Sequence, residues 1–242
     1  NDKLEAVVKG IRCMNFAGFN VTKPHKITIM KYLDELDELA EKIGSVNVVA
    51  IRDGKLKGYN TDGIGFARAL AEETGMDLSR NTFFIFGAGG ASRALSSTLA
   101  YQGVKKLYII DAFDEVSASL VKDINGRIRA CAEFVSVTPA PIRQLLQKCN
   151  VLVNASGIGM APHLGESPVH KKFLYKELFV YDITYNPPKT QLLVDAEEAG
   201  CRTMNGIGMA IHQGIKGFSI MTGMPEPTEI MRDAMYRIIG KK

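Results

Sequence analysis

The stretch FFIFGAGGASRAL, residues 83–95, decides the fold of this chain. Its apolar start predicts a buried strand, and the turn that follows places Gly87, Gly89 and the small Ser92 on a G-x-G-x-x-small pattern that opens a helix. In such a turn Gly87 permits the tight bend, Gly89 lets the backbone approach a pyrophosphate, and Ser92 lets the helix pack close to the strand. The free N–H groups and the dipole of the helix attract phosphates. The stretch predicts a dinucleotide site, with an ordinary tight turn as the alternative.

Strand and helix patterns alternate after this turn. Nearly continuous apolar runs are typical of parallel strands that are covered on both faces, and they lie at 106–111, 132–137, 151–156, 178–185 and 201–206. The alternation predicts an α/β protein with a Rossmann-like, doubly wound parallel sheet. We assign 65–206 to this dinucleotide-binding domain, 1–64 to a substrate (catalytic) domain, and 207–242 to C-terminal helices that pack back on the substrate domain.

The first 64 residues have shorter elements. Apolar spacing predicts helices over 3–14 and 26–43, with a short strand between them. Residues 46–60 have the pattern of a hairpin with its turn at Asp53-Gly54. The sequence starts with Asn1 rather than methionine, and we expect the substrate domain to lack its first βα units.

Composition excludes several classes of function. The net charge is +4 with lysine and arginine scattered, so we expect no nucleic-acid partner. The four cysteines lie far apart with no zinc-type spacing, so we expect no metal site and small, buried or half-buried thiols in a reducing compartment. No apolar run approaches the ~20 residues of a membrane helix and no signal peptide is visible, which predicts a cytoplasmic protein with no membrane partner.

The strand after the glycine turn ends at Asp111. This acidic residue lies about two dozen positions after the turn, where a carboxylate would hydrogen-bond the adenosine ribose. Residues 111–121 contain no lysine or arginine, whereas a 2′-phosphate needs a cationic partner. The sequence therefore favours NAD over NADP, with a helix-capping role for Asp111 as the alternative.

Two segments before the glycine turn carry groups suited to catalysis. Lys26 in NVTKPHK and Asp62 in YNTDG lie at the ends of strand-like segments, and a crevice between two domains is where a substrate meets a nicotinamide. Reduction of a ketone by hydride needs a proton donor, and a partly buried lysine positioned by a carboxylate is suitable. Neutral hydrogen bonds for a polyhydroxylated substrate would come from Asn20, Thr22, Asn47 and Asn60. From the residues alone, a solvated Lys26 and a turn-forming Asp62 explain the pattern equally well.

Seven motifs resemble the shikimate dehydrogenase family, which includes the quinate/shikimate dehydrogenases, in order and rough spacing. They cover nearly the whole chain: GFNVTKPHK, SVN, GYNTDGIGF, GAGGASRA, VNASGIGM, DITYNP and NGIGMAIHQG. The resemblance implies reversible oxidation of the ring 3-hydroxyl of shikimate, or of quinate, with NAD(P). It also implies a catalytic lysine at Lys26 with Asp62 as its partner. The substrate-binding residues that it implies are Thr22, Asn47, Asp62, Tyr185 and Gln213. Dinucleotide contacts are implied for Gly87, Ala88, Gly89, Gly90, Ala91, Ala155, Ser156, Ile183, Gly206 and Met209, in addition to Asp111.

The chain departs from the family pattern at three places. Nothing matches the Ser-x-Ser segment that clamps the substrate carboxylate, Asp111-Ala112-Phe113 stands where biosynthetic members have Asn-Arg-Thr, and Gly157 stands where Ser, Pro or Lys is more usual. Three alternatives stay open: shikimate against quinate, a paralogue acting on another cyclic hydroxy acid, and a dinucleotide-binding regulator without turnover. Retention of Lys26 and Asp62 argues against the regulator. We expect a monomer or a homodimer, and we expect Lys23 and His25 to be solvated.

Overall fold

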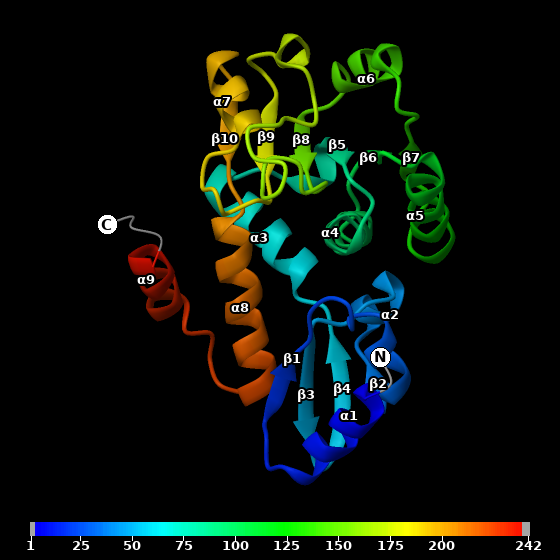
Figure 1. Cartoon of the computed structure of the whole chain (residues 1–242), viewed down its shortest axis with the longest axis vertical. Helices are drawn as coiled ribbons and strands as arrows, with labels where there is room; N and C mark the ends of the chain where they lie inside the picture. Colours follow the sequence, from blue (N-terminus) through cyan, green and yellow to red (C-terminus); the bar gives the residue numbers. More distant parts are fainter. Residues whose placement is uncertain (1–2, 239–242) are drawn as a thin grey trace.

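The computed structural model describes residues 3–238 and contains two sheets (Figure 1). The first sheet is mixed, with strand order β1-β3-β4-β2. It is antiparallel between β1, β3 and β4, whereas β2 runs parallel to β4. The elements of this part are α1 (Leu4–Cys13), β1 (Gly18–Asn20), η1 (Thr28–Tyr32), β2 (Glu35–Leu36), α2 (Glu38–Ile43), β3 (Val48–Arg52), β4 (Lys55–Tyr59) and α3 (Asp62–Thr74).

The second sheet has six parallel strands in the order β10-β9-β8-β5-β6-β7. The chain first winds outward from β5 to β7 and then returns to β8, which is the doubly wound topology predicted from the sequence. The point at which the direction reverses lies between β5 and β8. Its elements are η2 (Leu78–Arg80), β5 (Thr82–Phe86), α4 (Gly90–Tyr101), β6 (Lys106–Ile110), α5 (Asp114–Arg127), β7 (Ala132–Phe134), α6 (Pro139–Leu146), β8 (Val151–Asn154), η3 (Lys171–Phe173), β9 (Phe179–Asp182), α7 (Gln191–Glu198) and β10 (Arg202–Met204).

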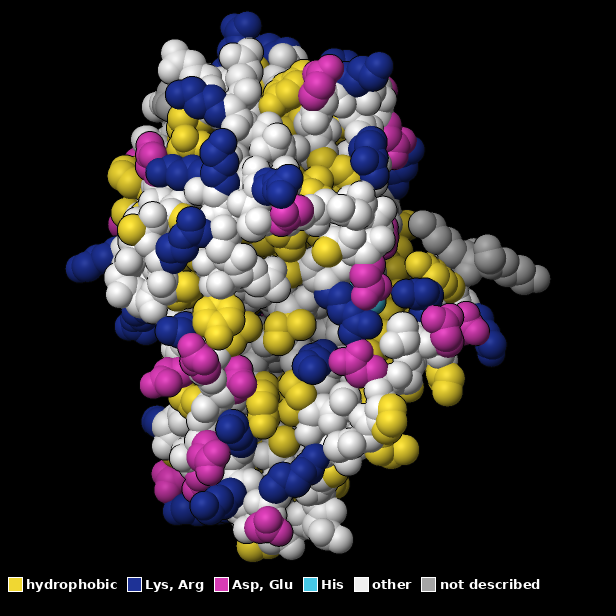
Figure 2. All heavy atoms as spheres, turned by 180° about the vertical axis from the view of Figure 1, so that it is seen from behind, with side chains coloured by type: hydrophobic (Ala, Val, Ile, Leu, Met, Phe, Trp, Pro, Cys, Tyr) yellow, Lys and Arg dark blue, Asp and Glu magenta, His cyan; other side chains and the backbone are white. Residues whose placement is uncertain are grey.

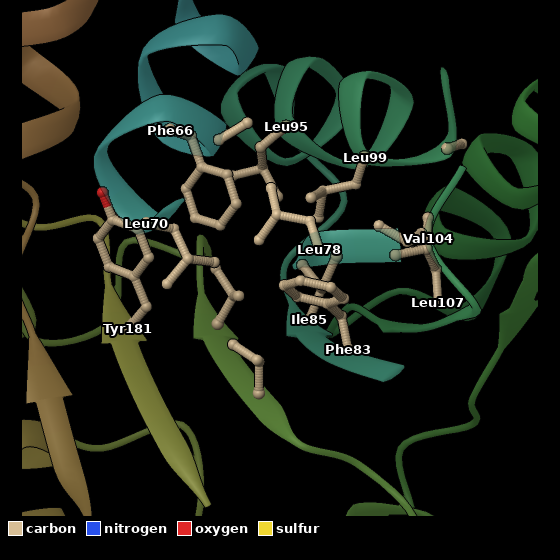
Figure 3. Packing of buried hydrophobic residues seen from close by; sticks show 14 of the residues in the cluster. Phe66, Leu70, Leu78, Phe83, Ile85, Leu95, Leu99, Val104, Leu107 and Tyr181 are labelled. Carbon is tan, nitrogen blue, oxygen red and sulfur yellow. The ribbon is translucent and has the colours of Figure 1, made fainter. Parts of the chain in front are cut away.

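Helices α3 and α8 (Ile207–Thr222) join the two sheets. Helix α8 packs along α3 and also against β1 and β3, and α9 (Thr228–Ile238) packs on α8. In the core of the second sheet, the rings of Phe66 from α3 and Tyr181 from β9 stack with centroids 4.7 Å apart (Figure 3). This stacking fixes α3 on the parallel sheet. The first residue of α3, Asp62, comes soon after the end of β4, which belongs to the other sheet.

The predicted hairpin and the predicted helix over 3–14 are confirmed, but the predicted helix over 26–43 is wrong. That segment contains η1, β2 and α2 instead. Asp34 explains the break, because its N–H donates to the Leu56 carbonyl over 2.9 Å and its carboxylate accepts from the Leu56 N–H over 2.7 Å, which fixes the chain beside β4. Asp37 then caps α2 by accepting from the Leu39 N–H over 3.1 Å. Short polar side chains thus interrupt what apolar spacing presents as one helix.

The surface carries charged side chains of both signs. Basic and acidic side chains are interspersed on the face shown in Figure 2 and form no basic stripe there. Cys131, Cys149 and Cys201 are buried as expected, but Cys13, the last residue of α1, is exposed. Within residues 3–238, no helix is long and apolar enough to cross a membrane, and no group of three or more His, Cys, Asp or Glu side chains could hold a metal ion.

Candidate active site

The glycine turn lies between β5 and α4, at the reversal point of the sheet. Gly87 has φ +98°, and a Cβ there would meet the Ala155 carbonyl oxygen at 2.6 Å, so only glycine fits beside the end of β8. Gly89 precedes the first turn of α4, which no side chain caps, and a Cβ at Gly89 or Gly90 would meet no protein atom within 4 Å. Ser92 is fully buried against the core. This geometry leaves open space and unpaired N–H groups at the end of the helix, which suits a pyrophosphate.

A cavity of about 460 Å³ opens above this turn. We call it the dinucleotide cavity. It is lined by eight of the predicted cofactor residues: Gly87, Gly89, Gly90, Ala91, Asp111, Ala155, Ser156 and Ile183. Ala88 is buried beneath it, and Gly206 and Met209 line a neighbouring cavity instead.

Asp111 contacts the glycine turn directly. One carboxylate oxygen accepts from the Ala88 N–H over 2.7 Å, and the other accepts from the Phe113 N–H over 3.2 Å. The side chain therefore fixes the turn as well as facing the cavity. Phe113, which precedes α5, has no capping side-chain bond of its own, so Asp111 does not act as a conventional N-cap of that helix.

Lys26 and Asp62 form the pair that the sequence suggested. The Lys26 ammonium lies 2.6 Å from Asp62 Oδ2, and the two side chains are only 26% and 14% exposed. Lys26 comes from the segment between β1 and η1, whereas Asp62 is the first residue of α3. The pair shows that Lys26 is not a solvated surface lysine and that Asp62 does more than form a turn.

Asn47 holds the carboxylate of this pair. Its amide nitrogen donates to Asp62 Oδ1 over 2.8 Å and to Thr61 Oγ1 over 3.0 Å, and its amide oxygen accepts from the Thr61 N–H over 2.8 Å. Asn60 supports the same turn, because its side-chain oxygen accepts from the Asp62 N–H and its amide donates to Ser45. The Asp62 carboxylate is thus fixed from both sides before any ligand binds.

A second cavity, of about 700 Å³, adjoins this pair. We call it the substrate cavity. All the predicted catalytic and substrate-binding residues line it: Thr22, Lys26, Asn47, Asp62, Tyr185 and Gln213. Asn20 also lines it, whereas Asn60 does not and is buried. Ile183 and Tyr185 line both cavities, so the two cavities adjoin, and the Lys26–Asp62 pair belongs to the wall of the substrate cavity.

Comparison with known proteins identifies the fold as a whole. Residues 1–49 match the family model for the shikimate dehydrogenase substrate binding domain, and residues 206–236 match that for the shikimate 5'-dehydrogenase C-terminal domain. The chain is 39% identical over 235 residues to a shikimate dehydrogenase (NADP(+)) of Methanopyrus kandleri, covering 97% of this chain and 81% of the relative. The chain belongs to the shikimate dehydrogenase family.

Two solved members of this structural group have the same architecture. Shikimate 5-dehydrogenase from Listeria monocytogenes, in complex with shikimate and NAD, has a TM-score of 0.91 at 38% identity over 97% of this chain and 83% of that one. Quinate dehydrogenase from Corynebacterium glutamicum, in complex with NAD, has a TM-score of 0.90 at 31% identity over 97% and 82%. These matches confirm the predicted family and fold class.

Sequence reasoning missed two contributors to the site. Thr61, at the start of α3, is fully buried, and its hydroxyl accepts a hydrogen bond from Asn47. The motif YNTDG predicts roles only for its neighbours, Asn60 and Asp62. Lys23 is exposed, as expected, but it also lines the dinucleotide cavity, which the sequence did not indicate. Nothing in the sequence around Lys23 indicates a cavity. Its position depends on the path of the loop between β1 and η1.

Proposed function

We propose that the protein catalyses the reversible, NAD(P)-dependent oxidation of the ring 3-hydroxyl of shikimate to 3-dehydroshikimate. The observation that carries the proposal is the Lys26–Asp62 pair, held by Asn47 in the wall of one of two adjoining cavities whose residues suit a dinucleotide and a polyhydroxylated acid. Family membership, and the shikimate bound to the Listeria enzyme, support this substrate class.

The residues of the chain account for proton transfer. A dinucleotide held by the residues of the dinucleotide cavity would supply the hydride acceptor for oxidation and the hydride donor for reduction. During reduction, negative charge grows on the carbonyl oxygen, and Lys26 stabilises that charge and supplies the proton. During oxidation, Lys26 reacts as the neutral amine, receives the hydroxyl proton and becomes the ammonium, while Asp62, fixed by Asn47, keeps its side chain aimed at the reacting oxygen. Thr22, Tyr185 and Gln213 bind and orient the ring from the walls of the substrate cavity.

For the cofactor we propose NAD in preference to NADP. The Asp111 carboxylate lines the dinucleotide cavity, where it would hydrogen-bond a ribose and repel a 2′-phosphate. The Listeria and Corynebacterium structures hold NAD, whereas the Methanopyrus relative is named for NADP(+). The Asp111→Asn variant removes the charge and keeps an acceptor for the Ala88 N–H but loses the acceptor for the Phe113 N–H, so its thermal unfolding is measured as well to separate the repulsion from a change in the turn. We expect it to raise kcat/KM for NADP while changing that for NAD much less.

Quinate is the second candidate substrate, because the quinate dehydrogenase of Corynebacterium shares this architecture. Initial rates with shikimate and quinate, each with NAD and NADP, measure all four combinations. We expect Lys26→Ala to lower turnover by about 10²–10⁴-fold without loss of dinucleotide binding. An active wild type and an equally active Lys26→Ala variant would contradict the assigned roles. Dinucleotide binding without turnover of either acid would instead support a paralogue or a regulator.

A further inference from the structure

Lys23 lies at a junction between the two cavities. It belongs to the loop that joins β1 to η1, and its sequence neighbour Thr22 lines the substrate cavity together with Lys26. Lys23 itself lines the dinucleotide cavity. One short loop of the first sheet therefore contributes to both cavities.

The charge of Lys23 has no partner within the described chain. Lys26, three residues later, is paired with Asp62, but none of the ion pairs among residues 3–238 involves Lys23. Lys23 is also the one lysine or arginine among the described residues that line the dinucleotide cavity. The acidic residue of that lining, Asp111, is already engaged with two backbone N–H groups. Among the described residues, Lys23 is thus the one cation of this lining, and no ion pair engages it.

The start of α4 forms another part of the wall of this cavity. Gly89, Gly90 and Ala91 line it there, no side chain caps the helix, and the glycines leave open space. A pyrophosphate at that helix end would accept hydrogen bonds from the free N–H groups. The two phosphate groups of a pyrophosphate carry two negative charges, whereas the helix end supplies only a partial positive charge. The cavity is therefore short of positive charge unless Lys23 supplies it.

We infer that Lys23 binds the pyrophosphate of the dinucleotide from the side of the first sheet. The inference rests on the proposed function and adds to it a phosphate-binding residue from outside the glycine motif. Because Lys23 shares its loop with Thr22 and Lys26, the bound dinucleotide also fixes the loop that carries substrate-cavity residues.

The test compares ligands with and without the pyrophosphate. Dissociation constants of ADP-ribose and of adenosine are measured by calorimetry for the wild type, Lys23→Met and Lys23→Arg. Lys148→Met is the matched control, because Lys148 is exposed and lines neither cavity. We expect Lys23→Met to bind ADP-ribose about tenfold more weakly, as for one charge-assisted hydrogen bond at a partly solvated site. Adenosine binding and thermal unfolding stay unchanged, Lys23→Arg retains most of the affinity, and the difference shrinks at high salt.

The outcomes separate this inference from the proposed function. If the wild type and Lys23→Met bind ADP-ribose equally, Lys23 does not contact the pyrophosphate, and the inference is overturned while the proposed function stands. Equal weakening of adenosine and ADP-ribose overturns it too, because the effect is then independent of phosphate. A raised KM for shikimate with unchanged ADP-ribose affinity assigns Lys23 to the substrate carboxylate and also overturns it. If the wild type binds no dinucleotide, both proposals are overturned.

Discussion

Replacing Gly89 by alanine would separate the role of the glycine turn in folding from its role in ligand binding. The backbone of Gly89 has φ −72° and ψ −170°, which any L-residue adopts, and an added Cβ would meet no protein atom within 4 Å. The fold therefore accommodates alanine without strain. Because alanine also restricts the unfolded chain, we expect Gly89→Ala to raise the free energy of unfolding by about 0.4–1 kcal/mol.

Dinucleotide binding responds in the opposite direction. Gly89 lines the dinucleotide cavity beside the first turn of α4, so its Cβ would occupy the space through which a pyrophosphate approaches the helix N–H groups. A phosphate held away from the helix loses at least one charge-assisted hydrogen bond, each contributing about 1.5–3 kcal/mol. We therefore expect the dissociation constant of ADP-ribose to rise by about 10- to 100-fold.

The assay combines urea denaturation with calorimetry of ADP-ribose binding. Gly10→Ala is the matched control, because Gly10 lies inside α1, lines neither cavity, and also has no atom within 4 Å of an added Cβ. That variant should gain a similar stability with no change in affinity. Unchanged ADP-ribose affinity in Gly89→Ala would refute the placement of the pyrophosphate. A loss of stability would refute the claim that this glycine serves ligand approach and not the fold.

Three further substitutions test other parts of the site. Gly206→Ala places a Cβ 1.8 Å from the Ile183 carbonyl oxygen, so it should destabilise the protein by more than about 3 kcal/mol in urea denaturation, and a cost below about 1 kcal/mol would contradict that packing. Asn47→Ala leaves the buried Thr61 N–H without its acceptor and should cost about 1–3 kcal/mol, with kcat falling at least about tenfold; unchanged kcat would show that Asn47 does not position the catalytic carboxylate. Burial lowers the pKa of His212 below its ordinary 6.5, so the folded state binds fewer protons than the unfolded state and stability falls as the pH drops below about 6.5. His212→Gln should flatten that part of the denaturation profile, and an unaltered slope would contradict the assignment.

The parallel domain and the β3–β4 hairpin of the first sheet were predictable because their sequence signals are local. Each strand is a short apolar run, the glycine turn has a fixed spacing, and Asp53-Gly54 adopts positive φ values as a two-residue hairpin turn requires. Because these features depend on neighbouring residues, they can be predicted without knowing how the rest of the chain folds. The helices α6 and α7 were not predicted.

Features that depend on distant contacts were not predictable. The break in the 26–43 segment depends on Asp34 reaching Leu56, and no local pattern announces that contact. Asp111 was assigned to a ribose, yet the structure also shows it bound to the Ala88 N–H of the glycine turn. That second contact couples residues 23 positions apart in sequence. It becomes visible only when β5 and β6 lie side by side.

The loop of residues 22–26 and the glycine turn come together at the two cavities because the two sheets pack against shared helices. Residues 22–26 follow an antiparallel strand of one sheet, whereas the glycine turn follows a parallel strand of the other, and α3 and α8 hold the two sheets together. Since Thr22 and Lys26 face the substrate cavity and Lys23 faces the dinucleotide cavity, a shift of this loop changes both cavities at once. We therefore expect a dinucleotide that fixes this loop to change the affinity for the acid, and the acid to change the affinity for the dinucleotide by the same factor. Lys26 belongs to the same loop, so calorimetry of each ligand in the presence and absence of the other measures this coupling, and equal affinities in both conditions would contradict it.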